Sequence, residues 1–162
     1  MSQLASTLGA YAAYHRDRRN VATHLVGIPL IVLAVVVLLS RPAWPVGDIA
    51  LTPAMILSVA AALFYLRLDL RFGLVMAGLL ALSCWLALPL AALATAVWLG
   101  WGVGLFVAGW AIQFVGHAFE GRKPAFVDDL KSLLVGPLFV VAEVAFVMGM
   151  RRALQAELAA LR

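Results

Sequence analysis

The chain is organised as long apolar runs separated by short polar segments. A membrane-spanning helix needs about 20 apolar residues. Four runs are long enough to predict such helices: residues 21–40, 49–66, 72–88 and 90–116. The first is followed by RPAWPVGD, the second by LRLDLR, and the third by Leu88-Pro89, which we interpret as a tight turn. This pattern predicts an all-α bundle in an integral membrane protein.

A fifth apolar stretch, residues 133–150, is interrupted early by Gly136-Pro137. It either spans the membrane or packs as a broken or re-entrant element, because non-helical backbone at that depth must be covered by protein or a wet cavity. The first 14 residues are mildly amphipathic, and residues 151–162 predict a short amphipathic helix at the surface. We therefore expect four to five transmembrane helices and a short N-terminal amphipathic helix, in a single domain over residues 1–162.

The composition supports a membrane protein. Of the 162 residues, 65% are apolar and 12% are charged, whereas a soluble domain is about half apolar and about a quarter charged. The basic cluster at residues 16–19 precedes the first apolar run, and no small-residue cleavage site follows that run, so we expect it to remain as an anchor. Cys84 is the single cysteine, which excludes an internal disulfide.

The formal charge of +4 is spread over short loops. It forms no basic stripe with interleaved aromatics, so we expect no nucleic-acid binding, and in a membrane protein Lys and Arg mainly report orientation. With the N-terminus in the cytoplasm, the basic residues within 16–19, 67–71 and 122–131 lie inside and Arg41 lies outside, as the positive-inside rule requires. A full fifth crossing would place Arg151 and its basic neighbours outside, against that rule. The predicted location is a bacterial inner membrane or the endoplasmic reticulum.

The three histidines are the first candidates for chemistry. On this orientation His15, His24 and His117 all come to the cytoplasmic ends of the first and fourth predicted spans, where they could form one layer. His15 and His24 are nine residues apart and would lie on opposite faces of one straight helix. Both can point inward only if the chain bends within residues 16–20, and Asn20 is a candidate N-cap for the helix that follows.

Gln113, His117 and Glu120 share one helix face, because residues i, i+4 and i+7 lie within a narrow arc at about 100° per residue. Imidazole with carboxylate suits Fe, Zn, Cu or Ni, and two or three histidines plus a carboxylate with open positions is typical of non-haem Fe(II) oxygenases. Ionisable groups inside a membrane are costly and mark functional sites. The alternative is that each histidine is an ordinary interfacial residue. Glu143 could be a ligand, an orienting partner or a proton acceptor, or it could pair with an arginine near a helix end.

Arg122 and Lys123 have two interpretations. Either they serve orientation alone, or they hold a substrate carboxylate at the interface, which an arginine can do with two parallel hydrogen bonds. The chain has no P-loop, no GxSxG, no CxxC and no dinucleotide fingerprint. Nucleophilic catalysis is therefore not indicated.

Two sequence blocks contain most of these residues: YHRDRRNVATHLVGIPL, residues 14–30, and QFVGHAFEGRKPAFVDDLKSLLVGPLFVVAEV, residues 113–144. The first block has Tyr-His, then Asn, His and Gly-Ile-Pro. The second has Gln-Phe-x-Gly-His, Phe-Glu, Lys-Pro-Ala, Gly-Pro-Leu-Phe and a Glu. In this combination the chain resembles the Mpo1-like family of membrane 2-hydroxy fatty acid dioxygenases, and the intervening helices match in hydrophobicity alone.

The resemblance implies an Fe(II)-dependent enzyme of fatty acid α-oxidation. Such an enzyme uses O2 to shorten a 2-hydroxy fatty acid by one carbon and releases the carboxyl carbon. The expected partners are this substrate, O2 and membrane lipid, and self-association into a homo-oligomer is left open. The resemblance implies that the metal ligands are His15, His24 and His117. The expected catalytic residues are Glu120, Glu143 and Asn20, and the expected substrate-binding residues are Arg122, Lys123 and Gln113.

Two rival hypotheses stay open. His24 and His117 could be the axial ligands of one haem, in which case the purified protein would have a Soret band. The chain could also be a non-enzymatic membrane protein, in which case replacing its histidines would change neither metal content nor activity. The clustering of polar groups at one predicted face argues against the second rival.

Overall fold

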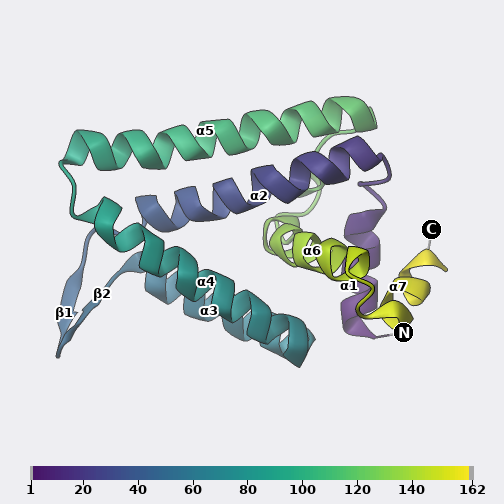
Figure 1. Cartoon of the computed structure of the whole chain (residues 1–162), viewed down its shortest axis with the longest axis horizontal. Coiled ribbons are helices and arrows are strands. Elements are labelled where there is room, and N and C mark those ends of the chain that lie inside the picture. The colour runs from purple at the N-terminus through teal and green to yellow at the C-terminus, as the bar shows by residue number, and fades with distance from the viewer. Residues whose placement is uncertain (1, 161–162) are drawn as a thin grey trace. The chain divides into compact units, whose positions relative to one another are not determined.

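The computed structural model describes residues 2–160, except for the side chain of Ile49. This part of the chain is mainly helical, with one short hairpin (Figure 1). Its elements are α1 (Gln3–Ala12), α2 (Arg18–Leu38), β1 (Trp44–Val46), β2 (Ile49–Leu51), α3 (Pro53–Leu68), α4 (Leu70–Ala91), α5 (Thr95–Glu120), the 3-10 turn η1 (Ala125–Val127), α6 (Ser132–Val147) and α7 (Arg152–Ala159). The predicted all-α class and the helix near each end are confirmed.

Among the described residues, three helices are long and apolar enough to cross a membrane: α2, α4 and α5. The pair α6 and α7, bent by 112° at its break, would add a fourth if it counts as one broken span. The predicted span at 49–66 is shorter than expected, because residues 49–51 form β2 and the helix begins only at Pro53. The 16 residues of α3 reach about 24 Å at 1.5 Å per residue, less than the ~30 Å of a bilayer's hydrocarbon.

The prediction of a tight turn at Leu88-Pro89 is wrong. Helix α4 continues through Pro89 to Ala91, and its C-terminal Ala92 N–H bonds back to Leu88 O. A proline fixes φ near the helical value and removes only one hydrogen-bond donor, so the last turn of α4 accommodates it. The polar LRLDLR segment does separate two helices, because Asp69 is extended and its carboxylate accepts the Phe72 N–H at 2.9 Å.

The hairpin was not predicted. In β1 and β2, Trp44 pairs with Leu51 and Pro45 with Ala50 in antiparallel register, and Gly47 turns the chain with φ +60°. Strands of three residues are too short to give an alternating apolar pattern, and the two prolines and the glycine indicated only a turn.

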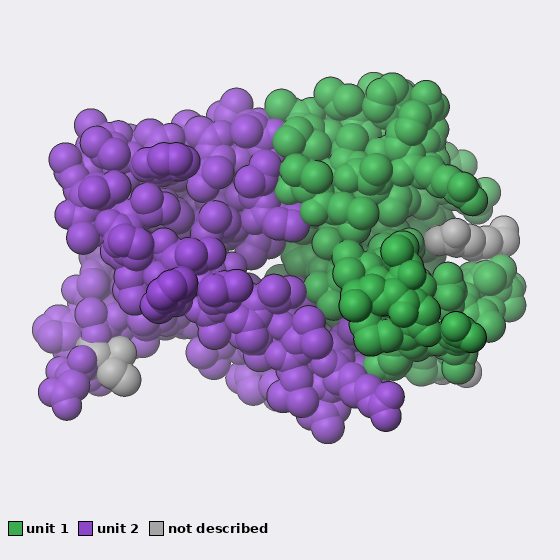
Figure 2. All heavy atoms as spheres, viewed as in Figure 1, with its two compact units in different colours: residues 1–28, 111–162 green, residues 29–110 purple. Residues whose placement is uncertain are grey.

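The chain divides into two compact units, coloured separately in Figure 2. Unit 2 comprises residues 29–110. Within it α3 and α4 lie side by side, and they meet so closely that a Cβ at Gly73 would lie 2.5 Å from Leu66 Cα. The Trp98 indole N–H donates to Val37 O at 2.8 Å. Whether the chain is one domain stays a prediction.

Unit 1 comprises residues 1–28 and 111–162. It contains α1, the first part of α2, the last part of α5, and α6 and α7. Helix α1 packs on α6 and α7, and its buried face consists of Leu4, Ala5, Leu8, Tyr11 and Ala12. This spacing of three and four residues is that of an amphipathic helix. Unit 1 also contains every histidine of the chain.

Candidate metal centre

The three histidines converge in unit 1. His15 lies between α1 and α2, His24 in the second turn of α2, and His117 in the last turn of α5. Their side chains are 1%, 2% and 7% exposed. Each offers one ring nitrogen to a group whose members all lie within 4.8 Å of one another. The first two histidines are separated by a bend, as predicted, but it lies at residues 13–17 and not at 16–20, because α1 ends at Ala12 and α2 begins at Arg18.

Two of the three rings are oriented by backbone carbonyls. His15 Nδ1–H donates to Tyr11 O at 2.8 Å, and His24 Nδ1–H donates to Asn20 O, also at 2.8 Å. These bonds assign the hydrogen of each neutral ring to Nδ1, so both Nε2 atoms present lone pairs. The two Nε2 atoms face each other at 2.9 Å. Two lone pairs at that distance are stabilised by a positive charge that both can bind.

The surroundings of His15 keep its ring neutral. The Tyr11 ring stacks on it with centroids 4.2 Å apart and an interplanar angle of 9°, and the Phe139 ring lies 5.6 Å away. Burial lowers the pKa of His15 to about 4, although the hydrogen bond to the Tyr11 carbonyl acts in the opposite direction. At neutral pH the imidazole is therefore uncharged, which is the form that ligates metals.

Further polar atoms lie buried near this cluster without hydrogen bonds to any described residue. They are His117 Nδ1, Asn20 Oδ1, and both Oε1 and Nε2 of Gln113. A buried unpaired polar group costs about 1–3 kcal/mol, and natural proteins keep few such groups. Gln113 lies one turn before His117 on the same helix face, as predicted, and its side chain is 3% exposed.

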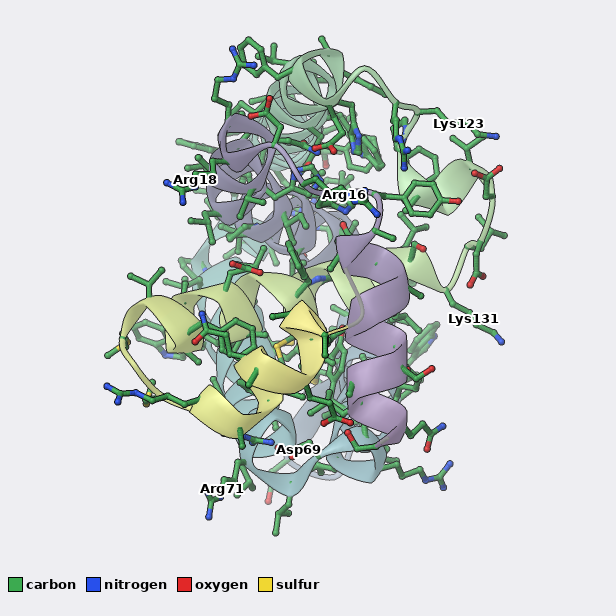
Figure 3. All side chains as sticks on the ribbon, turned by 90° about the vertical axis from the view of Figure 1, so that its right-hand side faces the viewer. Arg16, Arg18, Asp69, Arg71, Lys123 and Lys131 are labelled. Carbon is green, nitrogen blue, oxygen red and sulfur yellow. The ribbon has the colours of Figure 1, made fainter. Side chains whose placement is uncertain are left out.

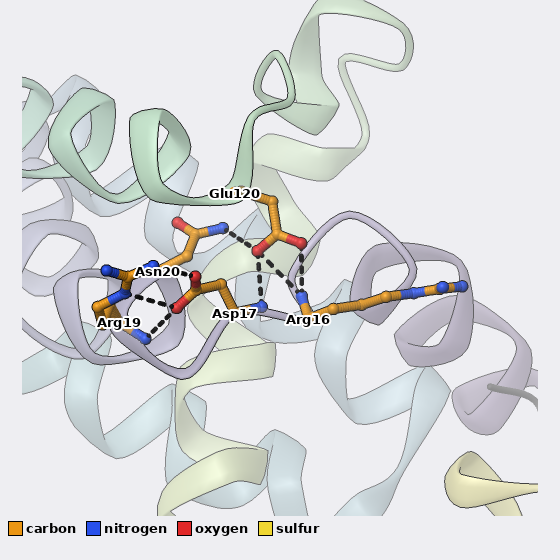
Figure 4. A network of polar contacts seen from close by, with 5 residues as sticks. All are labelled: Arg16, Asp17, Arg19, Asn20 and Glu120. Carbon is orange, nitrogen blue, oxygen red and sulfur yellow. Dashed lines mark hydrogen bonds and ion pairs between the residues drawn. The ribbon is translucent and has the colours of Figure 1, made fainter.

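Among the described residues, Glu120 makes four hydrogen bonds, none of them with a histidine. Its carboxylate accepts the Arg16 N–H at 2.9 and 3.1 Å, the Asp17 N–H at 2.9 Å and the Asn20 side-chain amide at 3.0 Å (Figure 4). Among the described residues, the group of converging ligand atoms contains the three histidines and no carboxylate. The predicted catalytic role of Glu120 stays a prediction. Its contacts are with residues at the start of α2.

The sequence suggested Asn20 as the N-cap of α2. That prediction is wrong, because the helix already begins at Arg18. The preceding residue, Asp17, accepts the Arg19 N–H at 2.8 Å through its side chain, which is how a capping residue acts. Asn20 is fully buried in the first turn, where its carbonyl orients His24 and its amide contacts Glu120. A catalytic role for Asn20 stays a prediction.

A glycine allows α5 to approach α2 at the level of the histidines. A Cβ at Gly116 would overlap Thr23 Oγ1 and lie 2.6 Å from Asn20 Oδ1. Gly116 immediately precedes His117, so this close approach brings the third imidazole to the other two.

The remaining predicted site residues are Arg122, Lys123 and Glu143. Arg122 Nη1 donates to Ala13 O at 3.3 Å, and Lys123 Nζ pairs with Asp128 Oδ1 at 2.5 Å. Lys123 projects from the surface of unit 1 in Figure 3. Glu143 lies on α6. Substrate binding by the two basic residues and catalysis by Glu143 stay predictions.

Sequence reasoning missed two aromatic residues of the site, Tyr11 and Phe139. Their rings lie 5.0 Å apart and enclose one side of His15. Tyr11 could have been recognised from its position four residues before His15, because a helical carbonyl at that spacing can reach the His15 ring.

The cluster fits a divalent transition-metal ion. Imidazole is a preferred ligand of Fe, Zn, Cu and Ni, and metal-binding histidines usually donate their other N–H to a carbonyl or carboxylate. His15 and His24 both meet that condition. Three protein ligands leave coordination positions for small molecules, as at catalytic metal sites.

Comparison with known proteins adds an independent finding. Residues 1–148 match the family described as "2-hydroxy-palmitic acid dioxygenase Mpo1-like". The chain is also similar to the Saccharomyces cerevisiae protein named 2-hydroxy-palmitic acid dioxygenase MPO1, at 39% identity over 159 residues, which covers 96% of this chain and 87% of the yeast protein. No solved structure matches. The matched region includes all three histidines.

Proposed function

Because the chain belongs to the Mpo1-like family, we propose that it is a membrane dioxygenase that uses Fe(II) and O2 to shorten a 2-hydroxy fatty acid by one carbon. The observation that carries the metal assignment is the convergence of three buried imidazoles, two of them with Nε2 turned inward by backbone carbonyls. His15, His24 and His117 would hold the ion. When bound, Fe(II) supplies the redox chemistry that activates O2.

The overall reaction balances without an external reductant. R–CHOH–COOH and O2 give R–COOH, CO2 and H2O, so the four electrons that reduce O2 come from the 2-hydroxy carbon and the carboxyl group. The protein must therefore bind the polar end of the substrate and exclude other reductants. Burial of the histidine cluster among apolar side chains serves that exclusion.

Gln113 is the proposed contact for the polar end of the substrate. Its carboxamide can accept a hydrogen bond from the 2-hydroxyl through Oε1 and donate one to a carboxylate oxygen through Nε2. Both atoms are buried without a partner among the described residues. A substrate that pairs with them would remove a desolvation cost that the protein otherwise bears alone.

The apolar helices suit the acyl chain of such a substrate. The three described helices that are long and apolar enough to cross a membrane would let the protein take its substrate from the lipid phase. The basic residues support a site near the cytoplasmic face by the positive-inside rule. There Arg122 and Lys123 would attract the carboxylate, with Lys123 exchanging its Asp128 partner.

The decisive experiment measures iron and turnover on the same detergent-purified protein. Wild type should contain iron and convert 2-hydroxypalmitic acid under O2 to the acid one carbon shorter, with one CO2 per O2 consumed. His117→Ala should lose both, whereas Ser83→Ala, at a half-buried residue of unit 2, should keep both. A wild-type protein without iron and without turnover would refute the proposal.

A haem is the less favoured cofactor. A porphyrin between His24 and His117 needs the space between these rings, but the His15 ring centroid lies 4.4 and 5.3 Å from theirs. The cluster is therefore better suited to a bare ion. A Soret band on the purified protein would reverse this preference.

A further inference from the structure

Glu120 connects the three segments that carry the histidines. It lies on α5 three residues after His117, its carboxylate accepts backbone N–H groups directly after His15, and it contacts Asn20, whose carbonyl orients His24. We propose that Glu120 is a positioning residue, which sets the geometry of the metal centre through these contacts without touching the metal. The inference rests on the metal-binding part of the proposed function.

The connection to His15 runs through the backbone. Residues 13–17 join α1 to α2. The N–H groups of residues 13–15 bond back to carbonyls of α1, but those of Arg16 and Asp17 lie ahead of α2 and need another acceptor. Glu120 supplies it from another helix, at 2.9–3.1 Å. A negative charge at the N-terminal end of α2 is also favoured by the helix dipole. These bonds fix the residue that directly follows His15.

The connection to His24 runs through Asn20. The Asn20 side-chain amide donates to Glu120 Oε2 at 3.0 Å, and the carbonyl of the same residue accepts His24 Nδ1–H at 2.8 Å. Asn20 is 0% exposed, so no water competes for its amide. A shift of Asn20 would turn the ring of His24.

A carboxylate is required because every group around it is a donor. The four contacts come from two backbone N–H groups and one amide. Glutamine would bring an NH2 against these donors, and aspartate would keep the acceptor atoms on a side chain one carbon shorter. The Arg16 guanidinium points away from Glu120 in Figure 4, so Arg16→Ala keeps the backbone N–H and is a matched control.

The test uses Co(II) as the probe, since its visible absorption reports ligand geometry independently of turnover. Loss of a partner that orients metal ligands typically lowers metal affinity about 10- to 100-fold. We expect that loss, with altered Co(II) bands, in Glu120→Ala and Glu120→Gln, a partial recovery in Glu120→Asp, and wild-type behaviour in Arg16→Ala. Asn20→Ala should weaken binding by less than Glu120→Ala, because it removes one of the connections.

A double variant checks that the two residues act together. If Glu120 works partly through Asn20, the affinity losses of Glu120→Ala and Asn20→Ala should combine to less than their product. Wild-type affinity and bands in Glu120→Ala and Asn20→Ala would overturn the inference, as would equal losses in Arg16→Ala. A wild-type protein that binds Co(II) but turns over no 2-hydroxy acid would refute the proposed enzyme and leave this inference standing. Failure of the wild-type protein to bind either Co(II) or Fe(II) would overturn both.

Discussion

The two units bury polar side chains for different reasons. Among the described residues, unit 2 buries Ser40 and Thr52, and each bonds to backbone close to it in sequence: Ser40 Oγ donates to Val37 O, and Thr52 caps α3 by accepting the Met55 N–H. The described part of unit 1 buries five polar residues: His15, Asn20, His24, Gln113 and His117.

The difference separates structural from functional polarity. Burying a polar group is costly unless it is hydrogen-bonded, and a hydroxyl that ends a helix is satisfied locally. The polar residues of unit 1 instead converge from distant parts of the chain, and several of their atoms have no hydrogen-bond partner among the described residues. Local hydrogen bonds to the backbone explain the buried polar side chains of unit 2 but not those of unit 1. Unit 1 is therefore the candidate site.

The largest effect should follow from removing a ligand. His24→Ala should abolish metal binding and activity, a greater loss than the roughly 10- to 100-fold typical of outer partners. Ser40→Ala, the buried polar change in unit 2, should leave metal content unchanged. Elemental analysis of both variants decides the matter, and equal metal content would erase the contrast between the units.

A methyl group at the close approach should have the next largest effect. Gly116→Ala would overlap Thr23 Oγ1, and such overpacking typically costs about 1–3 kcal/mol, here with weaker metal binding. Gly104→Ala, on the same helix but in unit 2, meets nothing within 4 Å and should stabilise by roughly 0.5–1 kcal/mol. Denaturation in detergent and Co(II) titration measure both, and similar results at the two glycines would contradict the close approach.

Gln113→Leu should separate function from stability. Removing hydrogen bonds to a charged substrate should lower kcat/KM for 2-hydroxypalmitic acid about 10- to 100-fold, as expected for bonds worth roughly 1.5–3 kcal/mol. The same change removes an unpaired buried amide, so the substrate-free protein should unfold at equal or higher temperature. Unchanged kcat/KM would show that the amide has no part in substrate binding.

The smallest effect on the site should come from the helix cap of unit 2. Thr52→Ala should cost about 1 kcal/mol of stability, the usual value for a lost N-cap. Metal affinity and kcat/KM should stay at wild-type values. If they fell with the cap, the two classes of buried polar residue would not be separable.

The sequence predicted what depends on long patterns or on rare residue types. The apolar runs of α2, α4 and α5 extend over many turns, so their helices were recognised. Three histidines in a mainly apolar chain indicated one cluster. Helix periodicity correctly placed Gln113 and His117 on a common face.

The sequence could not predict what depends on tertiary contacts. Pro89 suggests a turn by itself, yet the last turn of α4 accommodates it. Asn20 is a good capping residue by type, but Asp17 fills that position and Asn20 bonds to Glu120, 100 residues away. The Glu120 carboxylate resembled a metal ligand because of its spacing to His117. Only the fold shows the backbone N–H groups that surround this carboxylate.

The carbonyls that orient His15 and His24 have a consequence for mutational robustness. Each ring is held by the backbone oxygen four residues earlier, at Tyr11 and Asn20, and every amino acid carries that oxygen. Changing either side chain would remove its own packing or amide contacts but would keep the acceptor itself. The tautomers of these two imidazoles therefore depend on main-chain acceptors, which a point mutation does not remove. The third ring, His117, and its neighbour Gly116 remain sensitive to substitution.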